Sequence, residues 1–403
     1  MKKTKLALAI TAASFVATPV LATNGTNMVG LGAQSAAMGG TGVAAYYGAE
    51  NVVVNPGLIG KAVGSEFAFG GTVFMPSVST DYAGQGAKDS TANMNLIPSV
   101  SLVSRIDDQL TFGIGMYGTS GMGVDYRDED GLMNAQSNMQ IMRFVSTLAF
   151  NEANFGVGFS PIVQYGSLDI HYDAAAFNGG TSKPTGSGMA SDLGIGFSLG
   201  GYFDLTKELT LAAAYTSAIN MKYEGQLSTA SSNFVGMIPA AFGDELEQPA
   251  ELKLGAAYTM GNMLYTADFK QIAWSAAKGY KDFGWEDQNV IALGAKFSTE
   301  KYWAGVGFNT GNNPIKEQAN GATGGGAVIN MFNNIFFPAT TETHISVGGG
   351  YSLTSHLTLE GAIVMAPEVK TTVSAPTATP GTYTTSTTTH SQMGYTVTAR
   401  YNF

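Results

Sequence analysis

The feature that most restricts the fold of this chain is an alternation of side chains with a period of two residues. In the segment 391–403, aromatic and aliphatic residues take every second position, and small or polar residues lie between them. Successive side chains of a strand point to opposite faces, so the segment predicts a strand with one apolar and one polar face. The same rhythm occurs in SDLGIGFSLGGYF (191–203), AELKLGAAYTM (250–260) and THISVGGGYSL (343–353). The pattern therefore predicts an all-β protein.

The whole chain contains fourteen segments of this kind. The connections between them alternate in length, with short turns such as 106–108, 205–207 and 354–355 placed between long loops. This is typical of an outer-membrane barrel, which has tight periplasmic turns and long external loops. One long loop, 370–389, is rich in Thr, Pro and Ser and is expected to be flexible. The predicted strands are 66–75, 96–105, 110–118, 139–150, 154–170, 191–203, 209–223, 250–260, 262–273, 288–299, 302–312, 343–353, 357–369 and 391–403.

The composition indicates which face of the strands meets the surroundings. Only 12% of the residues are charged, about half the usual share, beside 52 glycines, 22 phenylalanines and 18 tyrosines. Such a chain covers a water-facing surface poorly, so the apolar faces are expected to contact lipid. A soluble β-sandwich has the same alternation, but the terminal Phe403 favours the membrane alternative. We predict a 14-stranded antiparallel transmembrane β-barrel over residues 65–403.

The first 64 residues do not follow the strand pattern. Residues 1–22 carry three lysines before an apolar run and end in Ala22, which predicts a secretory signal peptide. Residues 23–64 begin with a glycine-rich block that is poor for a strand or a stable helix and costs entropy to order. Such a segment persists only if something encloses it. Because a barrel of fourteen strands leaves a lumen, we predict that residues 23–64 form a plug, or hatch, inside it.

A family resemblance follows from the N-terminal block NGTNMVGLGAQSAAMGGTGVAAYYGAENVVVNPG (24–57), the fourteen strands and the terminal Phe403. The chain resembles the FadL-type outer-membrane transporters of long-chain fatty acids and other hydrophobic molecules. The family's Asn-Pro-Ala motif is here Asn55-Pro56-Gly57. The resemblance implies that the hatch residues include Met38, Gly39, Gly40, Asn55 and Pro56.

The resemblance also implies a route. A ligand is captured at the external loops, enters the barrel and leaves sideways after the hatch shifts, through a gap made by a kink in the third strand. That strand continues here as LTFGIGMYGTSGMGVDY (110–126), in which Gly118 and Gly121 occupy the position of the kink. Glycine suits a bulge or kink. The proline often found between them is absent.

Two external loops, 233–242 and 327–338, are unusually apolar and are candidates for ligand binding. An apolar patch that stays on the surface usually marks a binding site, although these loops could instead fold inward and pack on each other. Inside the barrel, alternation points Arg143, Lys253 and Lys270 inward, where they could pair with the carboxylate of an amphiphile or form lumen ion pairs. The candidate ligand-binding residues are Phe234, Val235, Met237, Ile238, Phe242, Phe332, Phe336, Phe337, Arg143 and Lys253.

The predicted function is passive transport of hydrophobic molecules, most simply long-chain fatty acids, across the bacterial outer membrane. The alternatives are a general diffusion porin for hydrophilic solutes and a barrel hydrolase. We expect a monomer that contacts outer-membrane lipid and lipopolysaccharide, with no enzymatic activity, cofactor or metal. The four histidines lack metal-ligand spacing. Nucleic acid is an improbable partner of an acidic chain of net charge −10.

Overall fold

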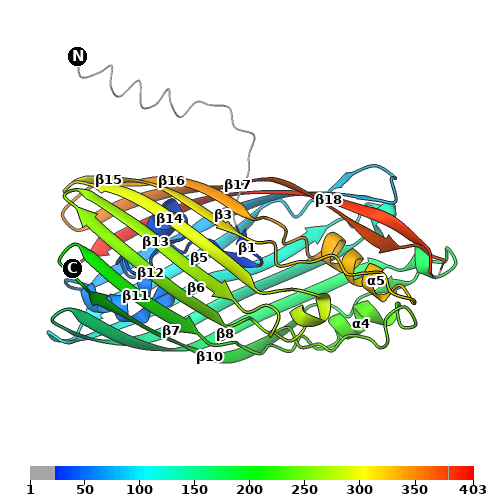
Figure 1. Cartoon of the computed structure of the whole chain (residues 1–403), viewed down its shortest axis with the longest axis horizontal. Helices are drawn as coiled ribbons and strands as arrows, with labels where there is room; N and C mark the ends of the chain where they lie inside the picture. The colour runs from blue at the N-terminus through cyan, green and yellow to red at the C-terminus, as the bar shows by residue number, and fades with distance from the viewer. Residues whose placement is uncertain (1–22, 380) are drawn as a thin grey trace, which may run out of the picture.

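The fourteen predicted strands form the wall of a closed barrel in the computed structural model, which describes residues 23–379 and 381–403 (Figure 1). The predicted signal peptide, 1–22, lies outside the described residues. Each strand pairs antiparallel with the next, and the last returns to the first, from Asn402 opposite Glu66 to Ser386 opposite Tyr82. The fold prediction is therefore confirmed. The strands are β3 (Glu66–Tyr82), β5 (Asn95–Arg105), β6 (Leu110–Asp125), β7 (Gln136–Glu152), β8 (Phe155–Asp173), β10 (Ala190–Asp204), β11 (Leu209–Thr216), β12 (Glu251–Met260), β13 (Met263–Ile272), β14 (Gln288–Ser298), β15 (Tyr302–Gly311), β16 (Thr343–Ser352), β17 (Leu357–Pro376) and β18 (Tyr383–Asn402).

Shorter elements lie in the N-terminal segment and in the external loops. No helix among the described residues has the length and apolar character needed to span a membrane. The two-residue strands are β1 (Thr23–Asn24), β2 (Asn27–Met28), β4 (Lys88–Asp89) and β9 (Pro184–Thr185). The helices are α2 (Ala33–Ala37), α3 (Asn51–Val54), η1 (Pro56–Lys61), η2 (Asp130–Leu132), η3 (Ala175–Phe177), α4 (Leu227–Ser232), η4 (Tyr280–Phe283), α5 (Gly325–Met331) and the π-helix η5 (Phe332–Phe336).

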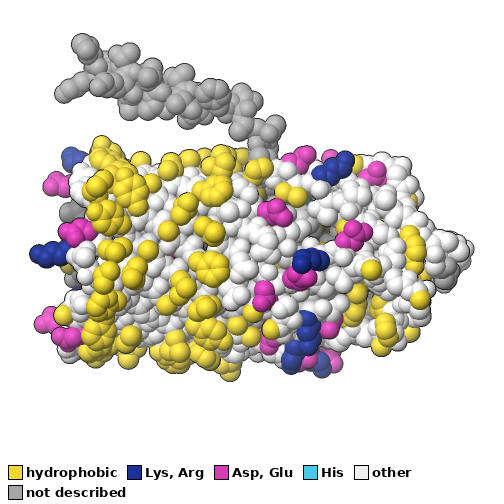
Figure 2. Space-filling view, in the orientation of Figure 1, with side chains coloured by type: hydrophobic (Ala, Val, Ile, Leu, Met, Phe, Trp, Pro, Cys, Tyr) yellow, Lys and Arg dark blue, Asp and Glu magenta, His cyan; other side chains and the backbone are white. Residues whose placement is uncertain are grey.

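The predicted alternation is visible in the exposure of the wall. On β18, Tyr395 and Val397 are exposed, whereas Thr396, Thr398 and Arg400 are buried. On the face that Figure 2 shows, apolar side chains lie mainly over the half of the barrel beside the short turns, and charged side chains gather at its rim and in a band toward the external loops. A wall that is apolar outside and polar inside is the arrangement expected when lipid surrounds the barrel.

Two predicted boundaries were wrong. The loop 370–389 is not an irregular loop, because β17 and β18 pair as far as Pro376 opposite Tyr383. Its many β-branched threonines suit a strand. The strand predicted over 209–223 ends at Thr216. Beyond it the chain turns, and Ile219 is buried within the molecule.

The N-terminal segment (residues 23–64) contributes no long strand to the wall, and its contacts reach inward-facing groups around the barrel. The N–H groups of Gly42 and Val43 donate to Asp268 Oδ2 of β13, at 2.8 and 3.0 Å. Asn55 Nδ2 donates to the Gly201 carbonyl of β10 at 3.2 Å. Most of the segment is buried. Its position is therefore inside the ring of strands, and its action as a plug remains a prediction.

The glycines of the N-terminal segment allow this close fit. Gly40 has φ of 81°, and a Cβ atom there would lie 2.0 Å from the Val29 carbonyl oxygen. A side chain at this position would both clash and strain the backbone. Glycine at position 40 is thus a requirement of packing.

Candidate functional site

A gap in the wall lies where β6 changes its pairing. The pairing of β6 with β5 ends at Tyr117 opposite Ser99. One residue later, the register between β6 and β7 shifts between Gly118 and Ser120. A recess of about 420 Å³ lies at this bulge, and both predicted kink residues, Gly118 and Gly121, line it. We call it the lateral opening. Its lining includes Phe74, Met94, Leu96, Ile97, Met122, Ser137, Met139, Met142, Pro338 and Ala339.

Two glycines lie where β6 changes its pairing, and a side chain at either would meet a neighbouring strand. A Cβ atom at Gly118 would lie 2.5 Å from Ile97 Cγ2 of β5, and one at Gly121 would lie 3.1 Å from the Met139 carbonyl oxygen of β7. Larger residues would therefore push against both neighbouring strands. The register shift begins at the first of these two glycines, and their role in a lateral exit stays a prediction.

The N-terminal segment covers the inner side of the lateral opening. Thr26 Oγ1 and Ser120 Oγ lie 2.7 Å apart, and the Gly121 N–H donates to the Thr26 carbonyl at 3.1 Å. Thr23, Gly25 and Met28 line the recess from within. Residues 23–28 thus lie between this recess and the interior of the barrel.

A small lumen cavity of about 60 Å³ lies between the N-terminal segment and the wall. The inward positions predicted for Arg143, Lys253 and Lys270 are those seen, since all three line this cavity with Glu251 and Asp268. Lys253 Nζ lies 3.1 Å from Glu251 Oε2. Arg143 donates from Nε to Gln164 Oε1 at 2.9 Å, with no carboxylate in ion-pair contact among the described residues. Three basic side chains thus face two acidic ones in this cavity.

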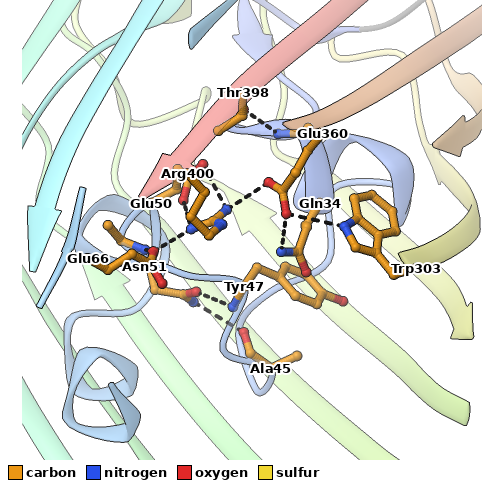
Figure 3. Close-up of polar contacts among 12 residues, drawn as sticks. Gln34, Ala45, Tyr47, Glu50, Asn51, Glu66, Trp303, Glu360, Thr398 and Arg400 are labelled. Carbon is orange, nitrogen blue, oxygen red and sulfur yellow. Dashed lines mark hydrogen bonds and ion pairs between the residues drawn. The ribbon is translucent and has the colours of Figure 1, made fainter. Parts of the chain in front are cut away.

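A buried ion cluster that the sequence analysis missed holds the N-terminal segment against the wall (Figure 3). Arg400 of β18 binds Glu50 of the segment at 3.0 Å, Glu360 of β17 at 2.9 Å, and Glu66 of β3. Glu360 also accepts from Gln34 Nε2 of the segment at 2.7 Å. The sequence signal that could have indicated this cluster is the position of two charged residues, Arg400 and Glu360, on the inward faces of strands whose other inward residues are uncharged.

The two apolar external loops meet each other in an aromatic cluster. Phe234 lies edge-on to Phe332 at 5.5 Å and stacks on Tyr172 at 6.2 Å, and Phe332 stacks on Phe336 at 5.3 Å. Such contacts stabilise beyond the area buried. Of the predicted ligand-binding side chains, Phe234, Ile238, Phe332, Phe336 and Phe337 are buried in this packing, and Met237 and Phe242 are half-buried. The inward-packing alternative therefore describes most of them.

One part of the aromatic cluster stays open to solvent. Val235 is 57% exposed. With Phe177, Phe234 and Met237 it lines an external recess of about 550 Å³, which also touches Ala322 and Thr323, a few residues before the other apolar loop. Residues from four external connections thus line this recess, the fourth being Ala378 and Gly381 between β17 and β18.

Tyr280 contacts both aromatic residues of the external loops and a residue that lines the lateral opening. Its ring contacts Trp274 at 4.6 Å and Trp285 at 4.8 Å, and its hydroxyl donates to Met139 Sδ at 3.7 Å. Burial raises the pKa of the Tyr280 hydroxyl, so the group stays protonated and able to donate. Among residues 23–379 and 381–403, no group of three or more His, Asp or Glu side chains is placed to hold a metal ion.

Comparisons with known proteins agree with this architecture. The family model described as "Outer membrane protein transport protein (OMPP1/FadL/TodX)" matches residues 9–403. A long-chain fatty acid transport protein of Escherichia coli O6:H1 is 22% identical over 319 residues, which are 65% of this chain and 70% of that protein. The Pseudomonas putida toluene transporter TodX superposes with a TM-score of 0.68 at 19% identity, over 93% of this chain and 99% of that one. A Pseudomonas aeruginosa FadL homologue gives 0.73 at 15% identity, over 94% and 100%.

Proposed function

This chain belongs to the family of outer membrane transport proteins that includes FadL and TodX, and on that premise we propose that it carries long-chain fatty acids inward by passive transport. As a member of this family it is an outer-membrane transporter for hydrophobic compounds. In our proposal the ligand is captured at the external recess and enters after the N-terminal segment moves. It leaves sideways through the lateral opening beside Gly118 and Gly121.

The observation that favours a fatty acid over a neutral hydrocarbon is the charge of the lumen cavity. Arg143, Lys253 and Lys270 face only Glu251 and Asp268 there. A carboxylate desolvated with its acyl chain needs such a partner, and hydrogen bonds to charged groups are the strong ones. A neutral aromatic compound gains nothing from these basic side chains.

The size of the lumen cavity supports a moving N-terminal segment. A cavity of about 60 Å³ holds only a few atoms, so it has room for a headgroup and none for an acyl chain. Met28, Val29 and Leu31 of the segment line it. In the proposal these residues move out of the cavity when the acyl chain of the ligand enters. The lumen is therefore either closed by the segment or occupied by the ligand.

The test compares two ligand classes in one variant. Arg143→Met removes a cavity cation that, like Lys270, has no carboxylate within ion-pair distance among the described residues, whereas Lys253 pairs with Glu251. Loss of a charged hydrogen bond of about 1.5–3 kcal/mol lowers the affinity for a long-chain fatty acid roughly 10- to 150-fold, while uptake of toluene stays unchanged. Binding is measured by calorimetry in detergent and uptake in proteoliposomes.

The control for this test is Lys61→Met, which removes a half-exposed cation bound to Asp204 outside the cavity. This variant keeps all three cavity cations and is expected to lose no affinity for fatty acid. Equal fatty acid affinity in Arg143→Met and the parent would contradict the carboxylate assignment and favour a neutral hydrophobic substrate.

A further inference from the structure

The lateral opening is rich in methionine. Five of its thirty lining residues are methionine, whereas the whole chain has 18 among 403 residues. These five come from four parts of the chain, namely the N-terminal segment, the connection before β5, β6 and β7. The enrichment is therefore a property of the assembled opening and not of one local stretch of sequence. The five residues are Met28, Met94, Met122, Met139 and Met142.

Four of these five methionine side chains are only partly enclosed by their neighbours. Met94 is 67% exposed, and the others except Met139 are half-buried. Met139 is buried, and its Sδ accepts from the Tyr280 hydroxyl at 3.7 Å. Methionine is unbranched and has three rotatable bonds, so it adapts its shape where the packing leaves room. The opening thus combines one anchored methionine with four that can rearrange.

Glycines beside the methionines provide this room. Gly118, Gly121 and Gly123 of β6 line the same recess, as does Gly25 of the N-terminal segment. Because glycine has no side chain, the long methionine side chains have open space next to them. A change of methionine rotamer therefore alters the shape of the opening without a movement of the backbone. β-branched residues at the same positions would be stiff at the first side-chain torsion.

We propose that the methionines of the lateral opening set the range of molecules that leave through the wall, so that hydrophobic compounds of different shape share this exit. The inference rests on the proposed transport function. Methionine is over-represented on surfaces that bind many different partners, because its side chain repacks around each of them. In the proposal, the basic side chains of the lumen cavity act on the headgroup, and the opening adapts to the apolar part of the ligand. A straight acyl chain and a flat fused-ring hydrocarbon both pass.

The test stiffens the opening without changing its polarity. One variant combines Met94→Ile, Met122→Ile and Met142→Ile, since isoleucine is apolar, suits a strand and is stiff at its first torsion. Protein-dependent uptake of pyrene relative to palmitate in proteoliposomes is expected to fall by about tenfold, the scale on which a hydrophobic pocket discriminates by size. Uptake of palmitate changes less, because a straight chain needs a narrower opening than a fused-ring system.

The matched control combines Met260→Ile, Met365→Ile and Met393→Ile. These three methionines belong to β12, β17 and β18 and line neither the lateral opening nor the external recess. The control makes the same three chemical changes elsewhere in the wall, so it is expected to keep the pyrene-to-palmitate ratio of the parent. An unchanged ratio in the first variant, or an equal fall in the control, overturns the proposal.

Folding and function are separated in this design. The heat-dependent mobility of the barrel in gels reports folding. If the isoleucine variant fails to fold, the three leucine substitutions at the same positions replace it, because leucine and methionine have similar volumes. Leucine is branched and has fewer rotatable bonds, so the ratio is expected to fall in the same direction. A parent protein that takes up neither ligand contradicts the proposed function itself. A parent that takes up palmitate but not pyrene contradicts the adaptable opening alone.

Discussion

Replacing Arg400 by methionine is expected to release the N-terminal segment. Arg400 is only 5% exposed, and its guanidinium is shared by Glu50 of the segment with Glu66 and Glu360 of the wall (Figure 3). Methionine fills much of the same volume without charge, so three buried carboxylates lose their common cation. Repulsion from the two wall carboxylates then acts on Glu50, the one member that belongs to the segment.

The size of the effect follows from burial. Removing one partner of a buried ion pair costs about 3–5 kcal/mol, because the remaining charge is left without compensation. If this loss of free energy destabilises only the state in which the segment closes the lumen, the ratio of open to closed barrels rises roughly 100- to 4,000-fold. The wall itself stays intact, because β18 keeps its backbone pairing with β3 and β17.

The assay is ion conductance of single barrels in planar bilayers. The control, Lys61→Met, breaks a second link between segment and wall, since Lys61 Nζ lies 2.6 Å from Asp204 Oδ1. That pair is about 30% exposed, and surface pairs contribute about 0–1 kcal/mol, so its loss raises opening by no more than roughly fivefold. The double variant Arg400→Met with Glu50→Gln should close again in part. Equal opening in Arg400→Met and Lys61→Met would refute the argument from burial.

Two other changes test the segment and the opening. Deletion of residues 24–57 is expected to leave a barrel that conducts small ions continuously, because these residues make the contacts with β10 and β13 inside the ring of strands; conductance as low as that of the parent would contradict a plug. Gly121→Val is expected to slow fatty acid uptake several-fold without unfolding, because its Cβ would already lie 3.1 Å from the Met139 carbonyl oxygen and the added methyl groups narrow the lateral opening. Unchanged uptake rates in stopped-flow would remove Gly121 from the exit route.

The wall could be predicted from the sequence because its information is local. Each strand carries its own alternation, as Thr396 and Val397 illustrate, and a lipid-facing surface makes the apolar face unambiguous. Gly118 and Gly121 of β6 likewise predicted a bulge or kink, and both lie within two residues of the observed register shift. Boundaries near the external loops were less predictable, because the hairpin of β17 and β18 continues through polar threonines where lipid no longer selects one apolar face.

The contacts of the interior could not be predicted, because they join residues far apart in the sequence. Arg400 and Glu50 are separated by 350 positions, and nothing near either residue indicates the other. The apolar loops show the same limit. Their composition predicts an apolar surface, but only the fold decides that Phe234 is buried and Val235 is exposed. Local patterns specify which face a side chain takes, and tertiary packing decides its partner.

The most direct test of the account is the ratio of two fluxes through the same proteoliposomes. Uptake of a long-chain fatty acid and swelling in isosmotic sugar are measured with the unmodified protein. The account predicts rapid entry of the fatty acid and no swelling, because the hydrophobic route leaves through the wall while the segment fills the lumen. Rapid swelling in sugar without uptake of the fatty acid would contradict it.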